Sequence, residues 1–415
     1  MLQAEITPAV AERQARRPTA VVLGLQQNGL GVVRALAQEG VVCIAVDGDP
    51  TSSWTATRHC REVVPCPDFN GPGLIDTLCE LGGRLEAPGI LIPTMDHTVL
   101  LVSEHRARLE EYFVHSLPGD DVIQQLMSKA TTYDFAIANG YRMPRTFVVN
   151  SVEGLEQCLS QIQMPCILKP QVKTRGFLEH RTAKAFFLHT VAEVRENYRI
   201  LAQGEPRVVV QEWIPGPDAN LIFCLYYFDV DGAPLGIFEG RKIRQHIPDC
   251  GTACSAEPWP DAYVRDAGIR FFQAAGYRGL GAIEFKIDSR DGSYHLMEPT
   301  VGRTEHLFAL AAANGVNLPY LAYCNMAKLP LPRVEQSKSV VQYVDWKRDW
   351  QSARIYHQRG DLSLREWSKI FWGRKQYSLF SLTDPGPWLH ATFVKPARRV
   401  RSKLKKIGRR FFGGS

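Results

Sequence analysis

The segment around the first glycine-rich loop constrains the fold of this chain more than any other. Two continuous apolar runs, TAVVLGL at 19–25 and VVCIAVD at 41–47, enclose that loop and a helical stretch. Runs of this kind are typical of strands buried on both faces of a parallel sheet, and their order predicts a βαβ unit. A third apolar run follows at 89–94, and Asp96 then opens another helical stretch. We therefore expect an open, Rossmann-like α/β domain over residues 18–125.

The loop itself leaves two interpretations open. Gly24, Gly29 and Gly31 would let the backbone approach a pyrophosphate at a helix N-terminus, and Asp47 ends the second strand where a ribose-binding acid would lie. The spacing is not G-x-G-x-x-G, so a tight strand-to-helix turn is favoured. A dinucleotide-binding oxidoreductase stays as an alternative, which predicts NAD(P) retention without ATP turnover.

The pattern changes after this domain. A helix is expected over 128–140, and the apolar runs CILKP and RVVVQEWI predict strands that end near Lys169 and Ile214. The tripeptide VDG marks the turn of one hairpin, and a second hairpin joins GAIEFKID to SYHLMEP. No repeat of 20–50 residues occurs, which disfavours solenoids and propellers.

Side chains that suit a nucleotide occur in order along this second part. Lys129 and Lys169 lie on separate elements, and each could neutralise phosphate oxygens as a point charge. The strand end 211–214 offers backbone N–H and C=O groups to a base edge, and Asp218 offers a carboxylate to a ribose.

Two further acids indicate a metal. Glu284 and Glu298 lie on adjacent predicted strands, and carboxylates in that arrangement can hold divalent cations that bridge phosphates. Glu284 is flanked by apolar residues, and acids in such surroundings are rarely buried unless they are paired or bind a metal.

The order and spacing of these residues resemble the ATP-grasp superfamily of ATP-dependent carboxylate–amine ligases, over roughly residues 18–325. The resemblance implies an α/β fold with a Rossmann-like N-terminal domain, a two-subdomain ATP-grasp fold and a small helical C-terminal extension. It assigns nucleotide binding to Lys129, Lys169, Gln211, Glu212, Ile214 and Asp218. It assigns metal binding to Glu284, Glu298 and Thr300. It assigns contacts with phosphate or substrate carboxylate to Arg303, Lys242 and Arg244, with Arg241 in the same basic segment.

One position departs from the family pattern. In the family the second metal acid usually stands in the pattern Glu-x-Asn, and the Asn is a further metal ligand. This chain reads Glu298-Pro299-Thr300. A threonine hydroxyl is a weaker metal ligand, so the number of metal ions stays open. The departure also keeps a non-catalytic ATP-binding scaffold at a membrane assembly as an alternative.

The reaction implied by the resemblance is an ATP-dependent ligation that uses ATP and Mg²⁺ or Mn²⁺. A carboxylate takes the γ-phosphoryl group, and an amine then displaces phosphate to give an amide or peptide-like bond on a small molecule or an envelope or polysaccharide precursor. A lid loop is expected at 173–180, where it would exclude water. Thr94, Asp96 and Thr252 are candidates for contact with the substrates.

Charge is distributed unevenly along the chain. Residues 391–415 contain nine of the 49 Lys and Arg residues and no acid, so the first 390 residues carry 40 bases against 43 acids. In residues 395–412 the apolar side chains recur every three or four positions among these bases, which predicts a cationic amphipathic helix for an anionic membrane surface. A tail that is solvated or docked on the acidic body is the alternative. No specific nucleic-acid partner is expected, since the body has no basic field.

Five of the eight tryptophans fall behind the ligase-like part. They are Trp346, Trp350, Trp367, Trp372 and Trp388. Packing within a helical extension is favoured over a stacking platform for a cofactor or sugar, because large aromatics dominate burial in most folds.

The expected segments and location follow from these patterns. The segments are a flexible N-terminus at 1–17, the pre-ATP-grasp domain at 18–125, the small subdomain at 126–205, the large subdomain with the metal site at 206–330, the Trp-rich helical extension at 331–390 and the basic tail at 391–415. No run of 18 apolar residues and no secretory signal is expected, and ten cysteines without zinc-site spacing read as reduced thiols. A cytoplasmic location is predicted, with peripheral attachment at the inner face of the membrane as an option.

Overall fold

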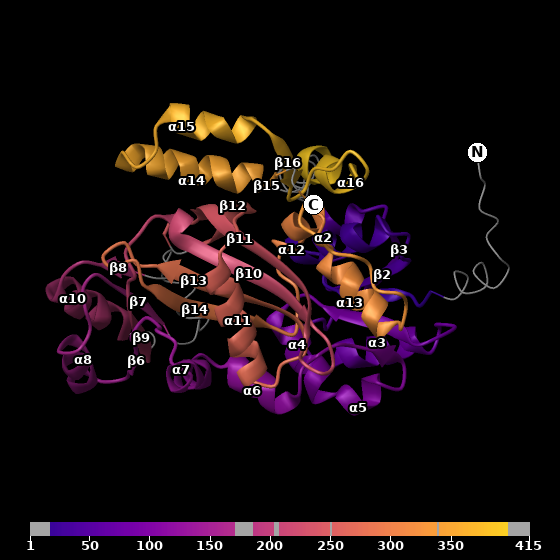
Figure 1. The fold of residues 1–415 in the computed structure, drawn as a ribbon, viewed down its shortest axis with the longest axis horizontal. Coiled ribbons are helices and arrows are strands. Elements are labelled where there is room, and N and C mark those ends of the chain that lie inside the picture. The colour runs from indigo at the N-terminus through magenta and orange to yellow at the C-terminus, as the bar shows by residue number, and fades with distance from the viewer. Residues whose placement is uncertain (1–16, 171–185, 203–206, 250, 338–339, 397–415) are drawn as a thin grey trace, which may run out of the picture. The chain divides into compact units, whose positions relative to one another are not determined.

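A computed structural model describes residues 17–170, 186–202, 207–249, 251–337 and 340–396. The chain divides into two compact units (Figure 1). Unit 1 comprises Met1–Thr132, Leu221–Glu284 and Pro299–Ser415, and unit 2 comprises Tyr133–Asn220 and Phe285–Glu298. Both mix helices and strands, as the α/β prediction requires. The expected lid and residues 397–415 of the basic tail lie outside the described residues.

The first sheet of unit 1 has five parallel strands in the order β3-β2-β1-β4-β5. Its strands are β1 (Ala20–Leu23), β2 (Cys43–Asp47), β3 (Cys60–Pro65), β4 (Gly89–Pro93) and β5 (Phe113–Val114). The helices in this part are α2 (Gln27–Ala37), α3 (Gly73–Gly82), α4 (Asp96–Glu104), α5 (Arg106–Leu109) and α6 (Asp120–Met127), with the short helix η1 (Trp54–Ala56). β1 and β2 are completely buried and pair in parallel around α2, which confirms the predicted βαβ unit.

The second sheet has seven strands in the order β14-β13-β10-β11-β12-β15-β16. They are β10 (Leu221–Phe228), β11 (Pro234–His246), β12 (Thr252–Pro258), β13 (Gly279–Ile287), β14 (Tyr294–Val301), β15 (Val341–Val344) and β16 (Arg374–Tyr377). The associated helices are α11 (Ala262–Ala274), α12 (Phe308–Ala313) and α13 (Leu318–Met326). β10 and β11 form the predicted hairpin, closed by a hydrogen bond from the amide of Asp229 to the carbonyl of Ala233.

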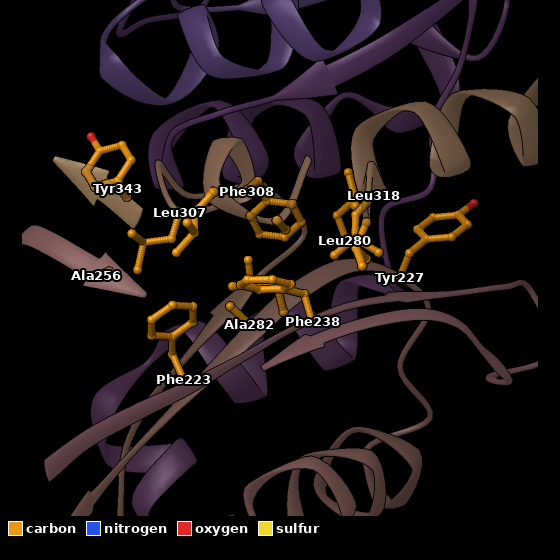
Figure 2. Packing of buried hydrophobic residues seen from close by; sticks show 14 of the residues in the cluster. Phe223, Tyr227, Phe238, Ala256, Leu280, Ala282, Leu307, Phe308, Leu318 and Tyr343 are labelled. Atoms are coloured by element: carbon orange, nitrogen blue, oxygen red, sulfur yellow. The ribbon is translucent and has the colours of Figure 1, made fainter. Parts of the chain in front are cut away.

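One apolar core of unit 1 lies where α12 and α13 cover this sheet, and a second surrounds the five-stranded sheet. Figure 2 shows Phe308 of α12 lying over Phe238 of β11, with Leu318 of α13 beside Leu280 of β13. All four side chains are buried. This packing holds the middle of the sheet, and with it Lys242 and Glu284, in a rigid frame.

Unit 2 contains a four-stranded antiparallel sheet in the order β6-β9-β7-β8. Its elements are β6 (Thr146–Val149), β7 (Cys166–Pro170), β8 (Phe186–Leu188), β9 (Val208–Glu212), α8 (Val152–Leu159), α10 (Val191–Ala202) and η2 (Asp218–Asn220), while α7 (Lys129–Ala138) begins in unit 1. Helices α8 and α10 pack on one face of the sheet (Figure 1), where Leu168 and Val210 join their apolar side chains in one core.

The C-terminal extension contains more than the helices that the sequence predicted. Its helical elements are α14 (Trp346–Arg359), α15 (Leu364–Ser368), η3 (Lys369–Phe371), α16 (Gly386–Leu389) and η4 (His390–Val394). In addition, β15 and β16 extend the second sheet beyond β12. Each of these strands has four residues, too few to show a strand period in the sequence. Asp384 fixes the end of the extension, because its buried carboxylate accepts hydrogen bonds from Arg34, Thr57 and the amide of Arg58.

The described residues bear on two properties of the chain, membrane crossing and the state of the cysteines. No helix among them has the length and apolar character needed to cross a membrane. The nine cysteines in the described part of the chain are free thiols.

Candidate functional site

Lys169 and Gln211 lie together on one face of the sheet in unit 2. Lys169 ends β7, Gln211 lies on the neighbouring strand β9, and the Lys169 Nζ donates to Gln211 Oε1 at 3.1 Å. Gln211 Nε2 donates in turn to Thr146 Oγ1 of β6 at 2.9 Å. Side chains alternate between faces along a strand, so this face is opposite to the one covered by α8 and α10. The sheet therefore presents the predicted phosphate lysine beside the predicted start of the base-binding segment.

Directly after β9, Trp213 contacts Lys286 of β13, a pair that the sequence analysis did not single out. The buried Lys286 Nζ lies 4.2 Å from the ring centroid of Trp213, which in turn meets Phe187 edge to face at 4.8 Å. A cation this close to an indole face is attracted by the ring quadrupole. Trp213 lies two residues beyond Gln211, and Lys286 lies two residues beyond Glu284. The strand period of two was therefore the signal that could have identified both.

The side chain of Glu212 points away from the face that carries Lys169 and Gln211. Its carboxylate accepts from the amide of Arg145 at 3.3 Å and lies 3.6 Å from the Arg290 guanidinium. It also lines a pocket of about 540 Å³ in unit 2, together with Asp288 and His295. Its contribution to a base-binding segment would therefore come from its backbone.

The other predicted nucleotide residues lie at element ends. Asp218 opens η2 and is buried, and Ile214 is buried shortly before it. Lys129 is the exposed first residue of α7. Lys129 belongs to unit 1, whereas Ile214 and Asp218 belong to unit 2.

In unit 1 the predicted metal acid Glu284 has a specific partner. The Lys242 Nζ of β11 lies 2.7 Å from Glu284 Oε2 of β13, and both side chains are largely buried. The strand β10 lies between their two strands in the sheet. An ion pair at so short a distance in a buried site orients both groups and keeps their charges compensated.

Glu284 has the chemistry of a ligand for a magnesium ion that is otherwise held by phosphates and water. Among the residues that the structure describes, no cluster of three or more His, Cys, Asp or Glu side chains could hold a metal alone. Mg²⁺ does not require such a cage, because one or two carboxylates usually bind it together with substrate phosphates and water. Glu284 supplies a hard oxygen of that kind, and Glu298 lies exposed on β14 in unit 2. Thr300 lies on the same strand, within unit 1.

The three basic side chains of β11, Arg241, Lys242 and Arg244, each contact a different acid. The Arg241 guanidinium pairs with Glu257 at 2.7 Å and lies 3.5 Å over the Trp259 ring. Arg244 pairs with the completely buried Asp349 of α14 at 2.8 Å. The structure thus joins Arg244 to the C-terminal extension, while Lys242 is the member of the segment beside a predicted metal acid.

Arg303 meets the candidate substrate residues in unit 1. Its Nε lies 2.5 Å from Asp96 Oδ1 at the start of α4. Nearby, the Asn28 amide donates to the carbonyls of Thr94 and Thr304 at 2.7 and 2.6 Å. These contacts join the first turn of α2, the end of β4 and the segment after β14, so residues far apart in the sequence form one polar cluster.

His306 adds a half-buried imidazole that the sequence reasoning missed. Its Nε2 lies 3.1 Å from the carbonyl oxygen of Ala253, and its ring meets that of Tyr343 at 5.5 Å. Burial and the nearby cations, among them Lys242 and Arg303, lower the pKa of His306 to about 3. The ring is therefore neutral at physiological pH and donates to Ala253.

The glycine-rich loop is explained by the course of the backbone. Gly24 adopts a φ of +89°, and a Cβ at Gly29 would lie 1.8 Å from the carbonyl oxygen of Gly24. The loop therefore needs these two glycines for its own geometry. This accounts for them as the favoured strand-to-helix turn.

The chain has relatives among characterised ligases, although no protein-family model matches it. It is 27% identical to the D-aspartate ligase of Enterococcus faecium over 323 residues, which are 72% of this chain and 74% of that protein. It is 23% identical to the D-alanine–D-alanine ligase of Bordetella petrii over 210 residues, which are 48% of this chain and 62% of the relative. The chain thus spans less than two thirds of the second relative.

Solved structures show the same fold. An N5-carboxyaminoimidazole ribonucleotide synthetase in its ADP complex superposes with a TM-score of 0.60 at 13% identity, covering 78% of this chain and 81% of that one. The biotin carboxylase domain of a Hydrogenobacter thermophilus 2-oxoglutarate carboxylase, crystallised with MgADP and bicarbonate, gives 0.58 at 16% identity and covers 78% and 74%.

Proposed function

We propose a reaction for this chain from the premise that it belongs to the ATP-grasp superfamily and is an ATP-dependent ligase of the carboxylate–amine class. The observation that carries the proposal is the buried pair of Lys242 and Glu284, with 2.7 Å between ammonium and carboxylate. Phosphoryl transfer needs a cation beside the phosphates and an oxygen donor for a metal, and this pair provides both.

In the first step the substrate carboxylate attacks the γ-phosphate, which gives an acyl phosphate and ADP. Lys169, with its Nζ placed by Gln211, neutralises charge on the nucleotide phosphates, and Lys129 adds a second cation. Lys242 and Arg303 stabilise the charge on the transferring group. A bound Mg²⁺, held by Glu284 and Glu298, would supply further charge neutralisation at the phosphates.

In the second step an amine attacks the acyl carbon, its proton leaves, and phosphate departs. We assign the substrates to the polar cluster of Arg303, Asp96, Thr94 and Asn28, because it offers one guanidinium, one carboxylate and several dipoles. The D-aspartate ligase relative makes small amino acids the first carboxylate or amine class to test. An envelope or polysaccharide precursor is the proposed acceptor.

The test is ADP and phosphate release across pooled carboxylates and amines. We expect release only when both a carboxylate and an amine are present. Glu298→Gln should abolish ADP formation, because it removes a metal-binding charge while keeping the shape. Thr300→Asn should retain or raise the rate. ATP binding without ADP formation in every pool, also after Thr300→Asn, would instead indicate a non-catalytic scaffold.

For the tail we propose attachment to an anionic membrane surface through residues 395–412. The proposal rests on the sequence alone, where nine bases of the C-terminal 25 residues surround an apolar stripe. Deletion of residues 391–415 should weaken binding to anionic vesicles. Unchanged vesicle binding after that deletion would contradict the proposed role of the tail.

A further inference from the structure

Four aromatic side chains of the C-terminal extension are exposed, and a fifth, Trp367, is half-buried. The aromatic patch consists of Trp346, Trp350, Trp367, Phe371 and Trp372. Trp346 and Trp350 are 44% and 45% exposed, Phe371 is 55% exposed and Trp372 is 77% exposed. Packing within the core of the extension was the favoured expectation for these tryptophans; it is wrong for Trp346, Trp350 and Trp372, whereas Trp367 is half-buried.

The aromatic patch is held in place from beneath. The Trp367 indole nitrogen donates to the completely buried Asp349 at 3.1 Å. Around Trp367 the rings of Trp350 and Phe371 lie at 4.9 and 5.1 Å, and Phe371 also lies 5.2 Å from Trp346. Trp346, Trp350 and Phe371 therefore belong to one supported cluster that joins α14, α15 and η3, and Trp372 directly follows Phe371 in the sequence.

The orientation of α14 explains the exposure. Its residues Asp349, Ser352 and Ala353 are buried, and the helix contacts β11 and β12. Trp346 and Trp350 are four residues apart, so they share the outward face of the helix. In Figure 1, α14 and α15 run beside each other at the edge of unit 1. A contiguous exposed apolar surface of this kind marks an interaction site more often than chance exposure does.

Charge around the patch points to an acidic partner surface. Residues 345–375 contain eight Lys or Arg residues and four acids. Asp349 is buried against Arg244, Asp345 lies 3.8 Å from Arg348, and Arg359 pairs with Asp249, which leaves an excess of exposed bases. The bases are Lys347, Arg348, Arg354, Arg359, Arg365, Lys369, Arg374 and Lys375. Tryptophan prefers the boundary between water and lipid, where its ring is buried and its N–H stays hydrated, and lysine and arginine are attracted to anionic headgroups.

We propose that the aromatic patch docks on the surface of an anionic lipid bilayer, with the surrounding bases on the headgroups. This contact is separate from the basic tail and needs only one face of unit 1. A nucleic acid is the alternative polyanion, and the test below distinguishes it from a bilayer.

The test uses the full chain, vesicles of phosphatidylcholine with or without phosphatidylglycerol, and lipids with brominated acyl chains. We expect co-sedimentation with the anionic vesicles only, together with quenching of tryptophan emission by the brominated lipid. Residues 397–415 contain no tryptophan, so quenching cannot come from that part of the tail. The double variant Phe371→Ser/Trp372→Ser should lower the vesicle affinity at least fivefold and reduce the quenching.

Leu382→Ser is the matched control, because Leu382 is 86% exposed and lies outside the patch. It should leave binding unchanged. Arg365→Glu/Lys369→Glu keeps every ring and should also weaken binding, so the proposal remains testable if the serine variant does not fold. Equal vesicle affinity of the folded serine variant and the parent would overturn the proposal. Binding to an RNA oligonucleotide, or dimerisation through the patch, without vesicle binding would also overturn it.

Discussion

At the scale of single residues, Lys169 offers a way to separate nucleotide binding from folding. Its Nζ contacts Gln211 on the sheet face that α8 and α10 leave uncovered, so truncation opens no cavity in their core. We expect Lys169→Ala to weaken ATP binding by roughly 1–3 kcal/mol, the scale for loss of a charge-assisted partner. Calorimetry with Mg²⁺ and ATP measures this, and exposed Lys347→Ala is the control. Unaltered affinity in Lys169→Ala would remove the assignment.

His306 makes a second prediction, concerning pH. Its pKa is lowered to about 3 by burial, against about 6.5 in an unfolded chain. The unfolded state therefore binds one more proton as the pH falls below about 6.5, and stability drops by up to roughly 1.4 kcal/mol per pH unit. Urea unfolding from pH 7 to 4 should show a smaller decline for His306→Gln, whose amide can still donate to Ala253. An identical pH slope in both proteins would show that His306 protonates without cost.

The residue types of the candidate site were predictable, but their partners were not. The period of two along RVVVQEWI places Gln211 and Trp213 on one face, and Lys169 follows from the strand CILKP in the same way. The pairing of Lys242 with Glu284 depends on a strand that lies between theirs in the sheet, and Arg244 pairs with Asp349 more than a hundred residues later. The sequence alone does not indicate such ion pairs, since any lysine or arginine can pair with any aspartate or glutamate.

At the scale of elements, helix caps and turn residues predicted the elements that are long or capped. Ser151 caps α8 as expected, because its side chain accepts from the amide of Gly154. Hairpin β10–β11 turns where the VDG tripeptide predicted. β15 and β16 escaped prediction because a four-residue strand is stabilised by its neighbours in the sheet rather than by its own pattern.

The turn between β1 and α2 gives a prediction for an element. A Cβ at Gly29 would lie 1.8 Å from the Gly24 carbonyl oxygen, whereas a Cβ at Gly31 would lie 3.1 Å from the Ala309 Cβ. Gly29→Ala should therefore lower the free energy of unfolding by about 3 kcal/mol, and Gly31→Ala should cost less. Urea unfolding of both variants measures the difference. Equal free energies of unfolding of the two variants would mean that the loop relaxes around the added Cβ. If Gly29→Ala instead lost bound NAD(P) while its stability stayed unchanged, the dinucleotide interpretation would be supported.

At the scale of the whole molecule, unit 2 is assembled from two separate segments, Tyr133–Asn220 and Phe285–Glu298. Sequence patterns predict contiguous segments. They therefore could not predict a unit that includes parts of the distant strands β13 and β14. The six segments of the sequence analysis remain a proposal about domains. The fold class was nevertheless predictable, because strand and helix periods identify an α/β chain before any tertiary contact is known.

The two units have separate apolar cores, so ligand binding should be visible unit by unit. Lys169 and Gln211 belong to unit 2, and a ligand that binds only the folded protein stabilises it by about 2.7 kcal/mol at a hundredfold excess over Kd. We expect Mg²⁺ and ATP to slow hydrogen exchange in peptides that cover β6, β7 and β9. NAD should leave these peptides unchanged, and Lys169→Ala should reduce the effect of ATP. Protection by NAD at the loop of residues 24–31, with none by ATP in unit 2, would contradict the nucleotide assignment, because a ligand can slow opening only where it contacts the folded state.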